Sequence, residues 1–305
     1  MFSFVFALGI FFIGLELNKY SLNKMAENKI KILLNKFTSN IYISILLGII
    51  LTAFIQSSSA MTIIVISLLE TSLLKFDRAL AIVIGANIGT TITAHIISIP
   101  IIKYYPILFV IGLLLLMFSI YIKKYKYFAL TIIAFSAIFG GLCLISDSLT
   151  KDFLGDFLLN ILNNNNYTSL LTVIIAAIIT ALIQSSSVFT GIVIKLAGKN
   201  LILFETSVLF IIGSNLGTCI TAFLASLNSS LKSKYLALTH LIFNIYGVLL
   251  ILPFKNYFFM ILKKTSPYLE RQIANGHSIF NFITLIFFLP LFFIFRELYL
   301  KECRF

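Results

Sequence analysis

The sequence predicts an all-α polytopic membrane protein made of two inverted-topology repeats, each with a re-entrant helical hairpin and a broken transmembrane helix. Of the 305 residues, 60% are hydrophobic and 11% are charged, and the mean hydropathy is +1.05. Soluble domains average about 25% charged residues. The apolar runs are long, as in Ile107–Met117, whereas a transmembrane barrel would alternate. A polar segment inside one such run occurs twice, and this duplication indicates the repeats.

The apolar spans set the order of the predicted elements. They fall near 1–17, 41–74, 79–99, 104–122, 127–146, 168–198, 203–225, 236–254 and 277–297. Most have the roughly 20 residues that a transmembrane helix needs. The first span lacks the positive n-region and the small-residue cleavage site of a signal peptide. We therefore expect a retained membrane helix at the N-terminus.

The duplicated polar segment lies in the two longest spans. Thr52–Ser59 returns as Thr180–Ser187, 128 residues later, with seven of eight positions identical. Spans 41–74 and 168–198 each exceed 30 residues, so one straight helix would be about 45–50 Å long against a hydrocarbon core of about 30 Å. Two half-helices that enter and return, with Gln-Ser-Ser-Ser at the tip, fit better. Such irregular backbone is tolerated in a membrane only inside protein or beside water.

Basic residues set the predicted orientation, because cytoplasmic loops collect Lys and Arg. Segment 19–36 and the pair Lys75 and Arg78 are basic, so we expect the first hairpin to begin and end on the cytoplasmic side. Three crossings then precede the second hairpin, namely 79–99, 104–122 and 127–146. An odd number of crossings inverts the second copy, as in many secondary transporters.

The predicted organisation is one integral membrane domain in three parts. Repeat 1 covers 1–122, repeat 2 covers 123–254, and 255–305 holds an interfacial segment and the last transmembrane helix. Each repeat carries an amphipathic connector before its hairpin, near 22–37 and 148–163. The C-terminus is expected in the cytoplasm. Four basic residues would then lie outside, so that stretch is either an interfacial helix or a miscounted crossing: Lys255, Lys263, Lys264 and Arg271.

A second motif repeats at the same offset. Gly85–Ala94 matches Gly213–Ala222 at seven of ten positions, and each copy contains Gly-x-Asn-x-Gly-Thr. Glycines weaken a helix, so we expect local unwinding that exposes carbonyls beside Asn and Thr oxygens. Such hard, neutral oxygens suit an alkali cation. The alternative is packing, since small residues also bring membrane helices together.

The hairpin tips predict an anion site. Ser is a good N-cap residue, and the second half-helix of each hairpin begins at the serines. A helix N-terminus offers unpaired N–H groups and the positive end of the dipole. Two such tips facing each other would hold an anion at mid-membrane without a fixed positive charge. Intramembrane polar clusters are functional by default.

Histidines form a third pattern, His240-Leu-Ile-Phe-Asn244 and His277-Ser-Ile-Phe-Asn281. His and Asn four residues apart share a helix face, so they could make interhelical hydrogen bonds or a proton path. Packing through hydrogen bonds is the simpler interpretation. We also expect His95, which has no counterpart in repeat 2, to be a hydrogen-bonded helix histidine.

Other function classes are disfavoured. Three scattered cysteines, Cys143, Cys219 and Cys303, argue against disulfides or a transition-metal site. No nucleophile–base pair is evident, so an enzyme is not expected, and neither is a cofactor. The net charge of +12 is better explained by cytoplasmic membrane loops than by nucleic-acid binding. The sequence does not set an oligomeric state.

The motifs together resemble the sodium/phosphate cotransporter family, meaning the type II group and its bacterial relatives. The likeness includes the opening Gly9–Leu17, both Gln-Ser-Ser-Ser tips, both Gly-x-Asn-x-Gly-Thr segments and both His-x-x-Phe-Asn helices. The resemblance implies that phosphate is held by Gln56, Ser57, Ser58, Ser59, Gln184, Ser185, Ser186 and Ser187. It implies that Asn87, Thr90, Asn215 and Thr218 belong to the same central site, and we expect sodium to bind at these four residues and Thr91.

Two departures from the family pattern stand out. Many bacterial relatives carry a C-terminal cytosolic helical domain, whereas this chain stops at Phe305. Cys219 also replaces the Thr that stands at position 91 in the first copy, which puts one cation ligand in doubt.

The expected function is sodium-coupled import of inorganic phosphate by alternating access, in the inner membrane of a bacterium. Phosphate, sodium and the lipid bilayer are thus the expected partners. The same fold could instead carry another small anion or use protons. A channel, or a membrane sensor or scaffold that does not transport, is the alternative from a different class.

Overall fold

The structure, a computed structural model, describes residues 2–37, 40–99, 104–149 and 167–302. Within these ranges every regular element is a helix, which confirms the all-α class. Six helices of this part of the chain are long and apolar enough to cross a membrane. The chain is therefore a multi-pass membrane protein.

The elements follow the predicted order closely. They are α1 (Phe2–Phe37), α2 (Ile41–Ile55), α3 (Ser58–Glu70), α4 (Phe76–Ile97), α5 (Tyr105–Phe118), η2 (Lys123–Tyr125), α6 (Lys126–Leu149), α8 (Ser169–Ile183), α9 (Ser186–Gly198), α10 (Phe204–Ser226), α11 (Leu231–Ile251), η3 (Leu252–Phe254), α12 (Lys255–Lys263) and α13 (Leu269–Glu302). The bounds of α8 and α9 are those of α2 and α3 shifted by 128 residues. The sequence repeat is thus also a repeat of helices.

Two long helices, α4 and α10, form the centre of the molecule, and both carry the Gly-x-Asn-x-Gly-Thr motif. The first arm of each hairpin packs on the motif helix of its own repeat, α2 on α4 and α8 on α10. The second arm also contacts the motif helix of the other repeat, α3 against α10 and α9 against α4. The hairpins therefore join the two repeats.

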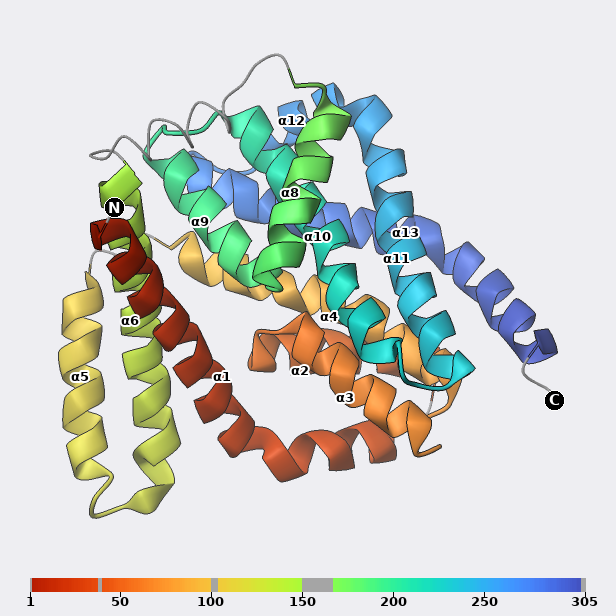
Figure 1. Cartoon of the computed structure of the whole chain (residues 1–305), viewed down its shortest axis with the longest axis horizontal. Coiled ribbons are helices and arrows are strands. Elements are labelled where there is room, and N and C mark those ends of the chain that lie inside the picture. Colours follow the sequence, from red (N-terminus) through yellow and green to blue (C-terminus); the bar gives the residue numbers. More distant parts are fainter. Residues whose placement is uncertain (1, 38–39, 100–103, 150–166, 303–305) are drawn as a thin grey trace.

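A separate group of helices flanks this centre. Helix α6 packs along both α1 and α5, and Figure 1 shows the three as a bundle at the left of the view. Most large apolar side chains of α5 are exposed, including Ile107, Val110 and Leu114. A lipid environment suits such a surface.

The expected break in the motif helices is absent, and this prediction was wrong. Helices α4 and α10 run without interruption through both motifs. Their glycines serve close packing instead. A Cβ on Gly85 would lie 2.2 Å from the carbonyl oxygen of Ile45 in α2, and one on Gly213 would lie 2.3 Å from that of Val173 in α8. The missing side chains let the backbones touch, as in other small-residue membrane interfaces.

Several boundaries also differ from expectation. Helix α1 continues to Phe37 through the expected connector 22–37, and Figure 1 shows it changing direction partway along. Helix α5 has 14 residues, short of the roughly 20 that span a bilayer. The second expected connector lies mostly at 150–166, outside the described residues. The number of crossings between the hairpins, and with it the inverted orientation, stays a prediction.

Candidate functional site

The two hairpin tips share one backbone conformation. Gln56 ends α2 with φ 58° and ψ 28°, and Gln184 ends α8 with φ 58° and ψ 23°. This left-handed region is uncommon for any residue other than glycine. The same strained turn at two equivalent positions reverses each chain within two residues, since α3 and α9 begin at Ser58 and Ser186. Strain of this kind persists where the surrounding structure holds it, often at functional sites.

The first serine of each tip caps the second arm, as the sequence predicts. The Ser57 hydroxyl accepts a hydrogen bond from the Ala60 amide at 3.2 Å, and Ser185 accepts one from Val188 at 3.5 Å. The next residues, Ser58 and Ser186, are buried at the first helical position. Each tip therefore offers a helix N-terminus to its surroundings.

The tips lie next to one another. The Ser187 hydroxyl donates to the Gln56 carbonyl oxygen at 3.5 Å, although 131 residues separate them. The Thr221 hydroxyl, on α10, donates to the Ser59 hydroxyl at 3.0 Å. Each tip thus contacts the opposite repeat, the second tip through Gln56 of the first tip and the first tip through Thr221 of α10.

A small cavity lies at this junction. Its volume is about 20 Å³, and its polar lining comprises Asn18, Gln56, Thr93, Ser185 and Ser187. A cavity of this size holds roughly one water-sized group. The tips are therefore closed on each other, and a phosphate-sized anion would require them to separate.

Thr93 and Thr221 are site residues that the sequence analysis missed. They are equivalent under the 128-residue offset, and each contributes to the region of the opposite tip. Thr93 is 7% exposed, and its hydroxyl has no hydrogen-bond partner among the described residues. A signal was present, because both threonines belong to the repeated ten-residue segment, three residues after the motif Thr.

The surroundings of the two tips differ. The Asn18 amide of α1 donates to the Gln56 side-chain oxygen at 3.0 Å, and Asn18 is buried. The Gln184 side chain is exposed. The first tip is therefore held by α1, whereas the second is open on one flank.

The motif asparagines pair with the histidines. His240 Nε2 lies 2.9 Å from Asn87 Oδ1, and His277 Nε2 lies 3.0 Å from Asn215 Oδ1. Asn87 also donates to Asn244 Oδ1 at 3.2 Å. All five side chains are buried. The interhelical hydrogen bonds considered for the His-x-x-Phe-Asn pattern are thus confirmed, with α11 serving repeat 1 and α13 serving repeat 2.

The motif threonines remain available as oxygen ligands. Thr90 donates to the Ala86 carbonyl at 3.0 Å, and Thr218 donates to the Ser214 carbonyl at 2.9 Å. A hydroxyl that donates once keeps lone pairs for a cation. Thr91 accepts from Ser278 at 2.9 Å, whereas its counterpart Cys219 accepts from the Asn244 amide at 3.2 Å.

His95 completes a chain of polar groups on one side only. Its Nε2 lies 2.7 Å from the Ser278 hydroxyl, which in turn donates to Thr91. The prediction of a hydrogen-bonded helix histidine is therefore confirmed. The equivalent position in repeat 2 is Phe223, so repeat 2 has no equivalent of this series of hydrogen-bonded polar groups.

Neutral polar groups dominate the junction of the tips. Among the described residues, no group of three or more His, Cys, Asp or Glu side chains could hold a metal ion. The residues that line the small cavity carry no formal charge. Hydroxyls, amides and helix ends of this kind can stabilise an ion without a counter-charge.

Comparison with known proteins gives a consistent result. The sequence model of the Na+/Pi-cotransporter family matches the chain twice, over residues 10–147 and 143–288. The uncharacterized protein YqeW of Bacillus subtilis is 33% identical over 93% of this chain and 92% of its own length. No solved structure matches.

Two further relatives have functional names. The putative inorganic phosphate export protein YjbB of Escherichia coli is 27% identical over 80% of this chain, which spans 45% of that protein. The human sodium-dependent phosphate transport protein 2B is 43% identical over 61 residues, 20% of this chain and 9% of its own length. The chain thus spans about half of YjbB. With its doubled polar tips and its double match to the family model, the chain belongs to the Na+/Pi-cotransporter family.

Proposed function

We propose that the protein imports inorganic phosphate together with sodium by alternating access. The observation that carries this proposal is the contact between the two hairpin tips, through Ser187 with Gln56 and Ser59 with Thr221. A site shared by two repeats can be opened to one side or the other by moving one repeat against the other. The closed junction described above corresponds to an occluded state.

Phosphate is assigned to the two tips. Backbone N–H groups at the starts of α3 and α9, together with the serine hydroxyls and the glutamine amides, provide donors to an oxyanion. The absence of a Lys or Arg among the residues lining the small cavity favours release. A fixed cation there would hold a phosphate dianion more tightly than a transporter needs.

Sodium is assigned to the motif helices. Asn87, Thr90, Thr91, Asn215 and Thr218 offer neutral oxygens on α4 and α10, the two helices that both hairpins contact. Because the motif helices are continuous, their carbonyls are used within the helix, and the ligands would be side-chain oxygens. Rotation of Asn87 or Asn215 away from its histidine would free a carboxamide oxygen for the ion.

The direction of transport follows from the coupling. A symporter works reversibly, so an inward sodium gradient drives phosphate in, whereas an uncoupled carrier lets phosphate leave a phosphate-rich cell. The printed name of YjbB describes export, which makes export without sodium the second candidate. We place the protein in the inner membrane of a bacterium with its C-terminus in the cytoplasm.

The deciding experiment is uptake of radiolabelled phosphate into proteoliposomes. We expect uptake that saturates with phosphate, requires external sodium, and is competed by excess unlabelled phosphate. Uptake without sodium stimulation would favour the export reading or proton coupling. Flux that does not saturate would indicate a channel, and no flux in either direction would leave a sensor or scaffold.

A further inference from the structure

Two basic cavities lie at the first turns of the two motif helices. The first has a volume of about 460 Å³ and lies at the start of α4. The second has a volume of about 620 Å³ and lies at the start of α10. Both are far larger than the closed cavity between the tips, and neither belongs to the site described above.

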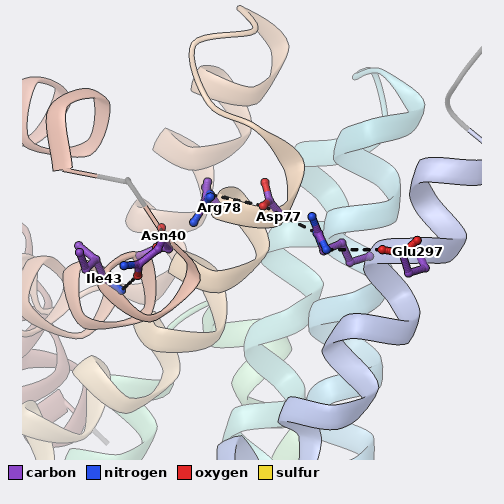
Figure 2. Close-up of polar contacts among 7 residues, drawn as sticks. Asn40, Ile43, Asp77, Arg78 and Glu297 are labelled. Atoms are coloured by element: carbon purple, nitrogen blue, oxygen red, sulfur yellow. Dashed lines mark hydrogen bonds and ion pairs between the residues drawn. The ribbon is translucent and has the colours of Figure 1, made fainter.

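Four basic side chains and one carboxylate line the first cavity. They are Lys75, Arg78, Lys232, Arg296 and Asp77. Asp77 Oδ2 lies 3.3 Å from Arg78 Nε and 3.9 Å from Arg296 Nε, and Figure 2 shows Asp77 between Arg78 and Glu297 of α13. One buried guanidinium nitrogen of Arg78 has no hydrogen-bond partner among the described residues. Arg296 also pairs with Glu297 at 3.5 Å, so four basic side chains lie beside two carboxylates here.

Three lysines and one carboxylate line the second cavity, with α12 forming much of its wall. They are Lys255, Lys263, Lys264 and Glu205. Lys263 Nζ lies 2.7 Å from Glu205 Oε1. Asp77 and Glu205 are equivalent under the 128-residue offset. The two cavities thus share a plan in which one acid of the repeat faces a surplus of basic groups.

The cavities lie on different sides of the molecule. Figure 1 shows α12 and the start of α10 at the top of the view, whereas α13 runs toward its C-terminal end at the lower right. The contact of Asp77 with Arg296 places the start of α4 beside that end of α13. The two basic cavities therefore face opposite sides of the molecule.

Membrane topology alone explains one cavity and not the other. Lys and Arg gather on the cytoplasmic side of membrane proteins, which accounts for the first cavity in the predicted orientation. The lysines of the second cavity then lie on the outer side, against that rule. A role in collecting an anion explains basic residues on both sides.

We propose that these two cavities are access pockets that concentrate phosphate, one on each side of the membrane. The inference rests on the proposed function. Clefts lined by one sign of charge raise the local concentration of an oppositely charged solute and its rate of binding. Arg and Lys are the natural partners of phosphate oxygens. Asp77 and Glu205 hold basic side chains in place while the pocket is empty.

The test uses charge reversal on each side. Lys232→Glu changes the first pocket, and Lys264→Glu changes the second. We expect each to raise the KM for phosphate roughly 3- to 10-fold on one membrane face only, the two variants acting on opposite faces. Right-side-out and inside-out membrane vesicles give the two faces separately. The maximal rate at saturating phosphate should stay near wild type, because the junction of the tips is untouched.

Two lysines outside the pockets serve as matched controls. Lys234 lies two residues from Lys232 on α11, and Lys199 lies on the side of the membrane predicted for the second pocket. The control variants are Lys234→Glu and Lys199→Glu. Neither side chain lines a pocket, so both variants should keep the wild-type KM. Equal effects of control and pocket variants, or pocket variants that act on the same face, would overturn the proposal.

A phospholipid headgroup carries the same phosphate chemistry, so a second arm separates the two sources. The KM measurements are repeated in vesicles with and without an anionic phospholipid. An effect of Lys232→Glu or Lys264→Glu that vanishes without anionic lipid would assign the pockets to lipid and overturn the access role. If the wild-type protein moves no phosphate at all, the proposed function fails and the inference falls with it.

Discussion

The two hairpin tips share sequence and backbone but not surroundings. Seven of eight residues are identical, and Gln56 and Gln184 take the same left-handed turn. Yet Asn18 of α1 holds Gln56, whereas the Gln184 side chain is exposed. The internal repeat thus encodes two tips of equal sequence and backbone, and the helices around them make their surroundings unequal. Inequality of this kind is what a carrier needs if only one side is to open at a time.

The largest expected effect comes from removing one hydroxyl at each tip. Ser58→Ala and Ser186→Ala should each lower phosphate uptake roughly 10- to 100-fold, because a hydrogen bond to a charged group contributes about 1.5–3 kcal/mol. Proteoliposome uptake, normalised to the amount of inserted protein, measures the loss. Ser44→Ala, a buried serine on α2 away from the tip, is the control. Normal uptake by either tip variant would contradict a site built from both hairpins.

Thiol labelling addresses the difference between the tips directly. In a protein whose native cysteines have been replaced, Gln184→Cys should react with a membrane-impermeant reagent about 10-fold faster than Gln56→Cys, because the first tip is covered. Adding Asn18→Leu should speed labelling at position 56 and leave position 184 unchanged. Equal labelling rates at positions 56 and 184, with Asn18 unchanged, would contradict the difference in exposure between the two tips.

The asparagine–histidine pairs predict a smaller difference. Asn87 contacts both His240 and Asn244, whereas Asn215 contacts His277. Each Asn→Ala change should cost about 1–3 kcal/mol, since it strands buried polar groups, and Asn87→Ala should cost more. Thermal unfolding in detergent, followed by circular dichroism, gives the order. Asn228→Ala, at an exposed position, should shift stability by less than about 0.5 kcal/mol. If Asn215→Ala lowered stability more than Asn87→Ala, the hydrogen bond between Asn87 and Asn244 would not be stabilising.

The outer ends of the hairpins give the smallest predicted effect. Glu70 at the end of α3 accepts hydrogen bonds from the Ser230 amide at 3.0 Å and from the Ser230 and Ser233 hydroxyls at 2.6 and 2.5 Å. The Ser230 and Ser233 hydroxyls lower the pKa of Glu70 below its usual value of 4.5. The contact therefore stabilises the fold above that value and loses its effect as the pH falls through the lowered pKa.

That contact has no carboxylate counterpart on the second hairpin, because Gly198 stands at the equivalent position. Glu70→Gln should therefore reduce the loss of thermal stability on acidification below about pH 4.5. The melting temperature measured across acidic pH in wild type and variant checks this. If wild type and variant lost the same melting temperature on acidification, carboxylates other than Glu70 would account for the acid sensitivity.

Much of the helical plan follows from the sequence because its signals are local. Polar residues inside an apolar run, followed by N-capping serines, locate the breaks at Gln56 and Gln184 without knowledge of any partner. The role of the motif glycines does not follow in the same way. Glycine both weakens a helix and permits close contact, and only the position of Ile45 and Val173 decides between the two.

The partners across the site were also beyond the sequence. Asn87 and His240 are 153 residues apart, and either His-x-x-Phe-Asn helix could have served either motif. Thr93 and Thr221 belong to the repeated segment, but nothing in the sequence around them predicts that they lie near the opposite tip. Long-range pairing of this kind is decided by how the helices pack as a whole.

The glycine contacts have a mechanical consequence. At the glycines, backbone packs against backbone between α2 and α4 and again between α8 and α10, and only small side-chain groups lie beside these contacts. In the proposed transport cycle, each pair is therefore expected to move as one rigid unit. Relative movement of the two repeats would then occur where α3 meets α10 and α9 meets α4, beside the hydrogen bonds that join the two tip regions. The surfaces expected to move in the proposed cycle would then adjoin the proposed binding site.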